Sequence, residues 1–377
     1  MNKHLSTTGL AAIFALSILP SAQAETFQTE KVAVSAERVV EGLSHPWGLD
    51  FLPNGELIVT EREGLIRIVG ANGLSDPVEG VPEVSARGQG GLLDIAVAPD
   101  FATSNTIFFT FSEPGDRGAG TAVARAKLVR DGDAARLDDV EVIFTMNRKT
   151  GTRQHFGSRI VFLPDGTLTF SIGDRGEGNR AQDMNDHAGA VLRINQDGSI
   201  PADNPWAGGG GAKELWSKGH RNPQGMTYDP VTKGLLTVEH GARGGDEVNQ
   251  PEAGKNYGWP VISYGVNYSG TRIGEGTEAA GYEQPLFYWD PSIAPSGLAV
   301  YQGDMFPEWN GDLLAGALKF ELLSRLDRDE SGKILSEERI LDGEFGRIRD
   351  VNVAPDGSIW LLTDENNGAI VRLTRAD

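Results

Sequence analysis

One pattern recurs six times along the chain and constrains the fold more than any other feature. A short apolar segment is followed by a tight turn and then by a second apolar segment. In the clearest copies the turn reads Pro-Asn-Gly or Pro-Asp-Gly, and these copies span residues 48–60, 157–171 and 350–363. Degenerate copies span residues 93–111, 225–238 and 297–317. Proline and glycine at a reversal flanked by β-branched residues are typical of a β-hairpin.

The spacing of these hairpins indicates how they are organised. Their turns lie at residues 53, 99, 164, 230, 310 and 355, so each unit has room for two further strands. Long repeats of this kind are typical of propeller blades, which contain four strands each. We therefore predict an all-β fold, a single six-bladed β-propeller over residues 25–377. A β-sandwich is the alternative, but it would not explain six similar hairpins across the whole chain.

The first 24 residues have a different character. Lys3 gives a positively charged start, residues 10–19 are apolar, and Ala22-Gln23-Ala24 supplies small residues at the end. This is the pattern of a secretory signal peptide, and the apolar run is too short to span a membrane. We therefore expect residues 1–24 to be a cleaved signal and the mature chain to be periplasmic or secreted, with no membrane span.

Composition excludes several classes of function. The 377 residues include 34 Lys and Arg against 53 Asp and Glu, giving a net charge of -19. Such a balance disfavours a nucleic-acid partner, because phosphate binding needs a basic face. Cysteine is absent, which removes thiolate nucleophiles, disulfides and the covalent attachment of c-type haem. Any metal must therefore be held by oxygen or imidazole ligands.

Polar side chains gather where the hairpins begin and end. These points lie at the same edge of an antiparallel hairpin, so the side chains should converge on one mouth of the propeller. Several cations around one axis are costly to crowd together unless something anionic is bound. The polar residues before a first strand are Gln89, Gln154, His155, Arg221, Asn222, Ser292, Arg347 and Arg349, and those after a second strand are Asp174, Glu239, His240 and Lys319.

A second group of polar residues lies between residues 239 and 260. Asp246, Glu247 and Asn249 offer oxygen ligands, and the neighbouring glycines allow backbone carbonyls to turn inward. Hard cations such as calcium require ligands of this kind, although the spacing is not that of an EF-hand loop. Plain turns are also rich in Gly, Asp and Asn, so the pattern indicates calcium only moderately.

Several of these segments together resemble the soluble PQQ-dependent glucose and aldose sugar dehydrogenases, over nearly the whole mature chain. Members of that family are six-bladed propellers that carry pyrroloquinoline quinone (PQQ) and calcium. The most specific segments are 155–159 (HFGSR), 171–174 (SIGD), 219–225 (GHRNPQG), 254–260 (GKNYGWP), 293–296 (IAPS) and 347–350 (RIRD).

The resemblance implies a role for each matching residue. His155 is similar to the family's general base, Asp174 to the carboxylate that orients it, and Arg221 to the cation beside the reactive quinone carbonyl. The backbone carbonyls of Gly241 and Ala242 match calcium ligands at the quinone. A second calcium would be served by Glu247 and the carbonyl of Tyr257. The positions that match PQQ-binding residues are Gln89, Arg221, Asn222, His240, Ser292, Lys319, Arg347 and Arg349.

Three positions depart from the glucose dehydrogenases. His240 replaces a glutamine, Ala242 replaces a proline, and Gln154 replaces an aspartate before the base. Ligation through a carbonyl tolerates the change at Ala242, whereas the other two changes would alter contacts with the sugar. The nearer match is to the aldose sugar dehydrogenases, which have shorter chains and a broader sugar specificity. The resemblance therefore does not imply specificity for glucose.

We therefore expect an enzyme that oxidises an aldose sugar at C1 to a lactone, with PQQ and calcium as cofactors and an external electron acceptor. A neutral imidazole is suited to removing the C1 hydroxyl proton near pH 7. Two other classes remain open at this point. A calcium-dependent propeller hydrolase, such as a lactonase, would not need the cationic cluster, and a non-catalytic sugar- or protein-binding propeller would need neither base nor metal.

Overall fold

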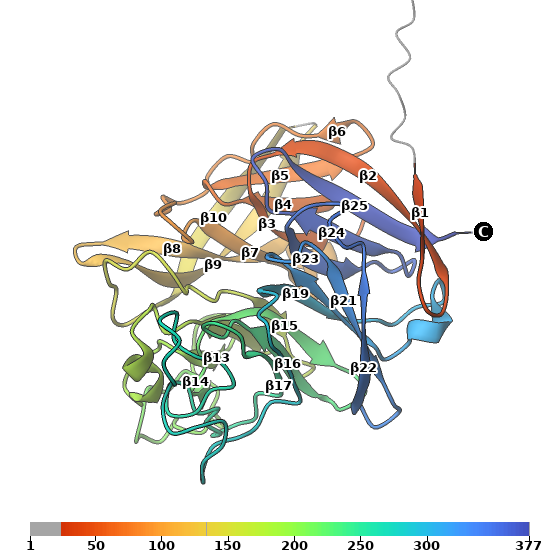
Figure 1. Ribbon diagram of the computed structural model, residues 1–377. Coiled ribbons are helices and arrows are strands. Elements are labelled where there is room, and N and C mark those ends of the chain that lie inside the picture. Colours follow the sequence, from red (N-terminus) through yellow and green to blue (C-terminus); the bar gives the residue numbers. More distant parts are fainter. Residues whose placement is uncertain (1–23, 133, 377) are drawn as a thin grey trace, which may run out of the picture.

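Six antiparallel sheets surround a common centre in the computed structural model, which describes residues 24–132 and 134–376 (Figure 1). The first sheet contains β3 (Pro46–Phe51), β4 (Leu57–Glu61), β5 (Leu65–Gly70) and β6 (Gly73–Leu74). The second contains β7 (Leu92–Val97), β8 (Thr106–Gly115), β9 (Gly118–Asp131) and β10 (Ala134–Thr145). The third contains β11 (Ile160–Phe162), β12 (Leu168–Ile172), β13 (Ala190–Ile194) and β14 (Leu215–Lys218).

The remaining three sheets continue the ring. The fourth contains β15 (Pro223–Asp229), β16 (Gly234–Glu239), β17 (Asp246–Asn249) and β18 (Phe287–Trp289). The fifth contains β19 (Pro295–Val300), β20 (Leu313–Ala317), β21 (Leu323–Arg328) and β22 (Ile334–Ile340). The sixth contains β23 (Ile348–Val353), β24 (Ile359–Thr363), β25 (Gly368–Arg375), β2 (Ala33–Leu43) and β1 (Glu25–Gln28). The described helical elements are short, namely α1 (Phe101–Ser104) and the 3-10 turns η1 (Gly178–Gln182) and η2 (Pro307–Trp309).

The predicted repeat is confirmed by this architecture. Each of the six hairpins forms the first two strands of one sheet; two further strands complete five of the sheets, and three complete the sixth. The first strands of neighbouring sheets lie against one another around the ring. The chain is therefore a six-bladed β-propeller, as the hairpin spacing predicts.

The closure of the ring is a feature that the repeat does not reveal. Strand β2, from the start of the described chain, pairs antiparallel with β25, from its end, so that Val34 lies opposite Arg375. The two strands run side by side in Figure 1. The sixth blade thus joins both ends of the chain and leaves no unpaired junction between the first and last repeats.

The apolar core lies between neighbouring blades. Ile66 of the first sheet packs in one buried cluster with Phe109 of the second, and Leu314 of the fifth sheet packs in another with Val351 of the sixth. Such face-to-face packing buries the apolar side of each twisted sheet. It fixes the blades relative to one another and so fixes the ends of the hairpins.

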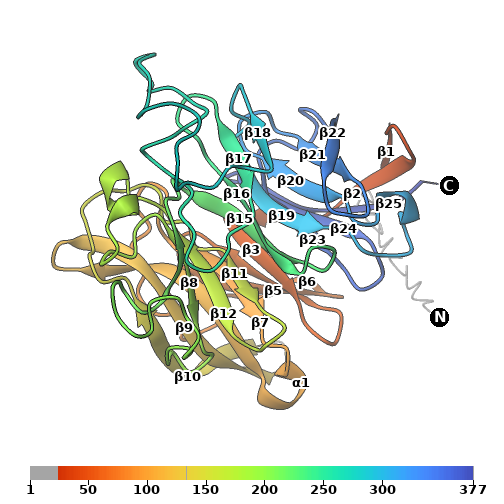
Figure 2. The ribbon, with the colours of Figure 1, turned by 90° about the horizontal axis from the view of Figure 1, so that it is seen from below.

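The two faces of the ring differ. The long connection between β17 and β18 projects from the side opposite to α1 (Figure 2).

Within the described part of the chain, no helix has both the length and the apolar character needed to cross a bilayer. The predicted signal peptide, residues 1–24, lies outside the described residues apart from Ala24.

Candidate active site

The polar ends of the hairpins meet around two adjoining cavities of about 840 and 170 Å³. Gln89, His240 and Ala294 line both cavities. The larger one is also lined by the predicted residues His155, Arg221, Gly241, Ala242, Ser292 and Lys319. The smaller one is also lined by the predicted residues Asn222, Arg347 and Arg349. The expected convergence is therefore correct for ten of the twelve polar residues, whereas Asp174 and Glu239 line neither cavity.

Strand register explains the convergence. In the fourth blade Pro223 pairs with Glu239, so the next residue, His240, donates its backbone N–H to the carbonyl of Asn222 at 3.2 Å. In the fifth blade the backbone N–H of Lys319 donates to the carbonyl of Ile293 at 3.0 Å. The residue before a first strand and the residue after a second strand thus lie beside each other in both blades.

His155 and Asp174 form a hydrogen-bonded pair at the edge of the larger cavity. Nδ1 of His155 lies 2.6 Å from Oδ1 of Asp174. Oδ1 also accepts the backbone N–H of Gly176 at 2.6 Å, and Oδ2 accepts the indole N–H of Trp259 at 2.8 Å. Burial alone would raise the pKa of Asp174, but the contacts with His155 and Arg221 outweigh it and the pKa lies below its usual value. An ionised Asp174 makes Nδ1 the protonated nitrogen of a neutral ring.

The other ring nitrogen of His155 is therefore the basic one. Nε2 has no hydrogen-bond partner among the residues that the structure describes, and the residue lines the larger cavity. Burial lowers the pKa of His155, and the hydrogen bond with Asp174 offsets only part of this effect. The charges of Arg221 and Arg175 lower the pKa further. The imidazole is thus a neutral base at pH 7.

Gln89 holds the backbone of this base. Its side-chain carbonyl accepts the backbone N–H of His155 at 2.7 Å. His155 adopts φ of 56°, in the left-handed region that residues other than glycine rarely occupy. Gln89 therefore lines both cavities, as expected, and also holds the backbone of the base, a contact that the sequence did not indicate.

Arg221 lies between the base and the fourth blade. Its guanidinium donates to the carbonyl of His240 at 3.0 Å and lies 5.2 Å from the ring centre of Trp259. Its Nε is buried and has no partner within the described chain. A buried donor of this kind is costly unless a ligand or water satisfies it. Arg221 therefore has hydrogen-bonding capacity left for a ligand.

His240 lies between the two cavities in a neutral form. Burial and the neighbouring charges of Arg221, His155 and Arg349 lower its pKa to about 3. Nε2 lies 2.8 Å from the carbonyl of Pro295, so this nitrogen carries the hydrogen. The ring can therefore offer Nδ1 as an acceptor.

Three cations surround the cavities with different degrees of pairing. Lys319 is exposed and has no carboxylate partner in the described ranges, and its ammonium lies 5.1 Å from the ring centre of Phe320. Arg349 donates to Asp364 at 2.6 Å, and Arg347 makes a longer contact with the same carboxylate at 3.4 Å. The buried Nε of Arg349 lacks a partner in the described structure. One carboxylate thus serves two arginines, and the rim keeps a positive excess.

Gly241 and Ala242 form the cavity wall next to His240. A Cβ on Gly241 would lie 2.2 Å from the carbonyl oxygen of Gly244, so only glycine fits there. Asp246 accepts the Gly241 N–H at 2.8 Å and the Ser292 hydroxyl at 2.7 Å. Asp246 is therefore used in fixing this wall, and Ser292, whose hydroxyl oxygen also accepts the backbone N–H of Ala294 at 3.3 Å, keeps one acceptor position for a ligand.

Glu247 and Tyr257 lie around an adjoining void of about 10 Å³, which Glu239 also lines and which shares Arg221, His240 and Gly241 with the larger cavity. This is roughly the space of one water-sized species. Burial and the charge of Glu239 raise the pKa of Glu247 to about 8. Two acids that repel each other beside a void would be stabilised by a cation. No group of three or more His, Cys, Asp or Glu side chains suited to a metal occurs in residues 24–132 and 134–376.

The residues that line the smaller cavity and were not predicted include Trp47, Arg62, Gln224 and Asp364. Trp47 begins the first hairpin, and Arg62 and Asp364 each follow a second strand. Applying the same positional rule to the first and sixth blades would have identified these three. Gln224 lies inside β15, and its position carries no such signal.

Comparison with known proteins places these observations in a family. A model of the glucose/sorbosone dehydrogenase family matches residues 43–372. An aldose sugar dehydrogenase of Escherichia coli, YliI, is 44% identical, with 90% of this chain and 93% of that protein covered. A crystal structure of the soluble aldose sugar dehydrogenase from Escherichia coli in the apo-form matches with a TM-score of 0.87 and 44% identity, covering 91% of this chain and all of that one.

A ligand-bound relative is also similar. The PQQ-bound form of an aldose sugar dehydrogenase from Streptomyces coelicolor matches with a TM-score of 0.74 and 29% identity, covering 90% of this chain and 98% of that one. The family model extends over all six blades, and the relative from Escherichia coli is 44% identical over 90% of the chain. The chain belongs to the glucose/sorbosone dehydrogenase family.

Proposed function

We propose that the chain is a PQQ- and calcium-dependent aldose sugar dehydrogenase, which oxidises the sugar at C1 to a lactone and passes electrons to an external acceptor. The observation that carries the proposal is the His155–Asp174 pair, whose basic nitrogen meets a cavity rimmed by incompletely paired cations. A hydrolase or a binding propeller would not need both features. The PQQ-bound relative supports the choice of cofactor.

The residues present fit PQQ, a planar quinone with three carboxylates. Lys319, Arg347 and Arg349 offer charges that carboxylates bind well. The unsatisfied Nε atoms of Arg221 and Arg349 are buried donors that an anionic ligand would satisfy. The positive excess in a chain of net charge -19 supports the same conclusion.

Calcium fits the wall formed by Gly241 and Ala242. Hard cations take backbone carbonyl ligands, and glycine permits the close approach that this wall requires. A second calcium would bind at Glu247 and Tyr257, where burial and the charge of Glu239 raise the pKa of Glu247 and a cation would stabilise its ionised form. The first site would act in catalysis and the second in stability.

The chain's own residues would remove the proton of the sugar hydroxyl and stabilise the charges that form. Nε2 of His155 takes the proton of the C1 hydroxyl while the hydrogen on C1 leaves as hydride. Asp174 holds Nδ1 at 2.6 Å, which keeps the ring in one tautomer and stabilises the imidazolium that forms. Arg221 supplies fixed positive charge where negative charge develops. When bound, PQQ supplies the carbonyl that accepts the hydride, and calcium polarises it.

We also propose that the enzyme acts in the periplasm or outside the cell, which the predicted signal peptide supports. Electrons would then leave to a separate carrier, since the chain has no cysteine for covalent haem.

Reconstitution tests this function directly. The purified mature chain is mixed with Ca²⁺, PQQ and an aldose, and reduction of an artificial dye is followed together with formation of the lactone. We expect dye reduction only when all three are present, loss of activity on chelation, and better recovery with Ca²⁺ than with Mg²⁺, which demands a tighter octahedral shell. Dye reduction by metal-stripped protein with PQQ and sugar alone would contradict the calcium assignment. The absence of any PQQ-dependent oxidation would contradict the function.

A further inference from the structure

Arg175 directly follows Asp174, and none of its surface is exposed (0%). In the described ranges it forms no ion pair with a carboxylate, although Arg180 and Arg325, two other buried arginines, do so at 2.8 and 2.6 Å. Burying a charge without such a partner is costly. The position of Arg175 therefore needs an explanation.

The guanidinium of Arg175 binds the chain around the candidate base. It donates hydrogen bonds to three backbone carbonyls, those of Gln154, of Thr152 at 2.8 Å and of Ala119 at 3.3 Å. It also lies 3.5 Å from the ring centre of Phe156. Gln154 and Phe156 are the immediate neighbours of His155, so Arg175 holds the chain on both sides of the base.

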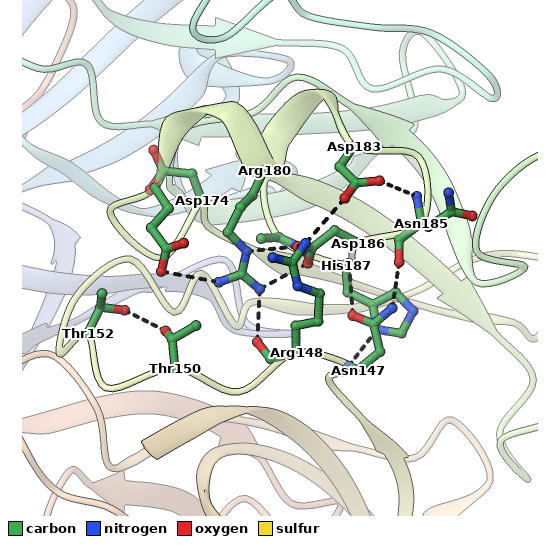
Figure 3. A network of polar contacts seen from close by, with 12 residues as sticks. Asn147, Arg148, Thr150, Thr152, Asp174, Arg180, Asp183, Asn185, Asp186 and His187 are labelled. Carbon is green, nitrogen blue, oxygen red and sulfur yellow. Dashed lines mark hydrogen bonds and ion pairs between the residues drawn. The ribbon is translucent and has the colours of Figure 1, made fainter. Parts of the chain in front are cut away.

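A separate network holds the earlier part of residues 146–159, the connection between β10 and β11 that contains His155 (Figure 3). Arg180 donates to the carbonyl of Arg148 at 2.8 Å, and both arginines bind the carboxylate of Asp186. Neither side chain contacts His155 in the described structure, so this network does not position the base. That task falls to Arg175 on one side and Gln89 on the other.

The backbone at the base needs such support. Residues 146–159 contain no strand, and His155 and Ser158 have φ of 56° and 96°. Residues other than glycine keep such conformations only where their surroundings impose them. The buried guanidinium of Arg175 provides this constraint through its three hydrogen bonds and its contact with the ring of Phe156.

We infer that Arg175 is a positioning residue for His155, which keeps Nδ1 on Asp174 and Nε2 directed to the cavity. The inference rests on the proposed function for its kinetic test and on geometry alone for its spectroscopic test. Misplacing a catalytic group by about 1 Å can cost on the order of 10²-fold in rate, so a loosened base should be slow.

The charge of Arg175 provides a second readout. The charged and titratable groups that act on His155 are Asp174, Arg221, Arg175 and His240. Burial lowers the pKa of Arg175 to about 9, which leaves it charged at neutral pH. Its charge lowers the pKa of His155, so removing it should raise that pKa. Because the neutral base is the active form, the acid limb of the kcat profile should move to higher pH.

The experiment compares three variants of the full mature chain. Arg175→Met removes the hydrogen bonds and the charge, Arg175→Lys keeps the charge, and Arg325→Met removes a fully buried arginine in the fifth blade. Each is characterised by melting temperature, PQQ loading, kcat, KM and the pH dependence of kcat. Histidine resonances are titrated by NMR in the absence of PQQ and assigned with His155→Ala.

For Arg175→Met we expect kcat to fall about 10–100-fold with little change in KM, and the pKa of His155 and the acid limb to rise together. Arg175→Lys should keep the parent's acid limb and recover part of kcat. Arg325→Met should lower the melting temperature and leave both kcat and the acid limb unchanged.

An unchanged kcat and an unchanged His155 pKa in folded Arg175→Met would overturn the inference. If that variant does not fold, an Arg175→Lys enzyme with the parent's kcat would overturn it equally. If the parent itself shows no PQQ-dependent oxidation, the function fails, while the NMR shift still decides whether Arg175 acts on His155.

Discussion

Two of the four histidine–carboxylate pairs in the described structure, those of His155 and His220, have the same chemistry and different surroundings. Nδ1 of His155 lies 2.6 Å from Asp174, and Nδ1 of His220 lies 2.9 Å from Glu239. The second ring nitrogen of His220 is bound by the Ser217 hydroxyl at 2.8 Å, and the residue is fully buried. The second nitrogen of His155 has no partner within the described chain and faces a large cavity.

The difference shows that the pair itself does not define a catalytic base. The other carboxylate oxygen of Glu239 accepts the backbone N–H of Arg221 at 2.6 Å. The His220 pair therefore supports the fold and the position of that arginine. The His155 pair leaves one nitrogen for a proton. What distinguishes the two sites is therefore an unfilled hydrogen-bonding position beside a cavity.

The largest expected effect separates the two histidines. His155→Ala should lower kcat by about 10²–10⁴-fold, because it removes a general base, while PQQ binding is nearly intact. His220→Ala should lower the melting temperature, because Glu239 loses a partner in a buried site. Steady-state dye reduction at measured PQQ loading compares the two.

The two variants serve as controls for each other. Near-normal turnover of fully loaded His155→Ala would remove this residue from the mechanism. An equal loss of kcat in loaded His220→Ala would show that the contrast between the two pairs has no catalytic meaning.

The carboxylate beside the base gives the next largest effect. Asp174→Asn should lower kcat by at least about 10²-fold, because an amide no longer fixes the tautomer or stabilises the imidazolium. The carboxylate raises the pKa of His155, so its loss should move the acid limb of kcat to lower pH, opposite in direction to Arg175→Met. A pH series of kcat on folded, loaded enzyme measures this shift. An acid limb that moves upward would contradict the assigned pairing.

The fold could be predicted from sequence because its signal is local and repeated. Each hairpin carries its own turn and its own apolar strands, so six independent copies support one conclusion. The pairing of β2 with β25 has no such signal, since it joins the two ends of the chain and depends on the ring being closed. Its register follows from packing of the whole propeller.

The site was predictable where it follows from position along a hairpin. His155, Arg221 and Lys319 were found because strand ends converge, which is a property of the hairpin itself. Nothing in the sequence distinguishes Arg175, and only the structure shows its burial and its carbonyl partners. The division of the acids also needed the structure, because Asp246 is used in the wall whereas Glu247 faces a void.

Incompletely paired cations extend the comparison to ligand binding. Lys319→Ala and Arg347→Ala should each weaken PQQ binding roughly 10–150-fold, because each removes a charge-assisted contact of about 1.5–3 kcal/mol. Lys255, whose ammonium already binds Glu283 at 2.8 Å, is the matched control, and Lys255→Ala should leave PQQ affinity unchanged. Titration of apoprotein with PQQ measures all three. Unchanged affinity in both rim variants would place the cofactor elsewhere.

The smallest effect on turnover is expected beside the His220 pair. Glu247 approaches Glu239 there, and a calcium ion would offset the burial and the Glu239 charge that raise the pKa of Glu247 to about 8. An ion that binds only the folded chain stabilises it by RT ln(1 + [L]/Kd), so calcium should raise the melting temperature of the parent. Glu247→Gln should lose much of that rise and yet keep its kcat at saturating calcium and PQQ, because Glu247 lines neither of the two cavities. Calorimetry with and without Ca²⁺, on parent and variant, decides the point. If Glu247→Gln instead abolished turnover while keeping the full calcium-induced rise, the ion at this void would belong to catalysis, and the division between a reactive histidine pair and a supporting one would have to be redrawn.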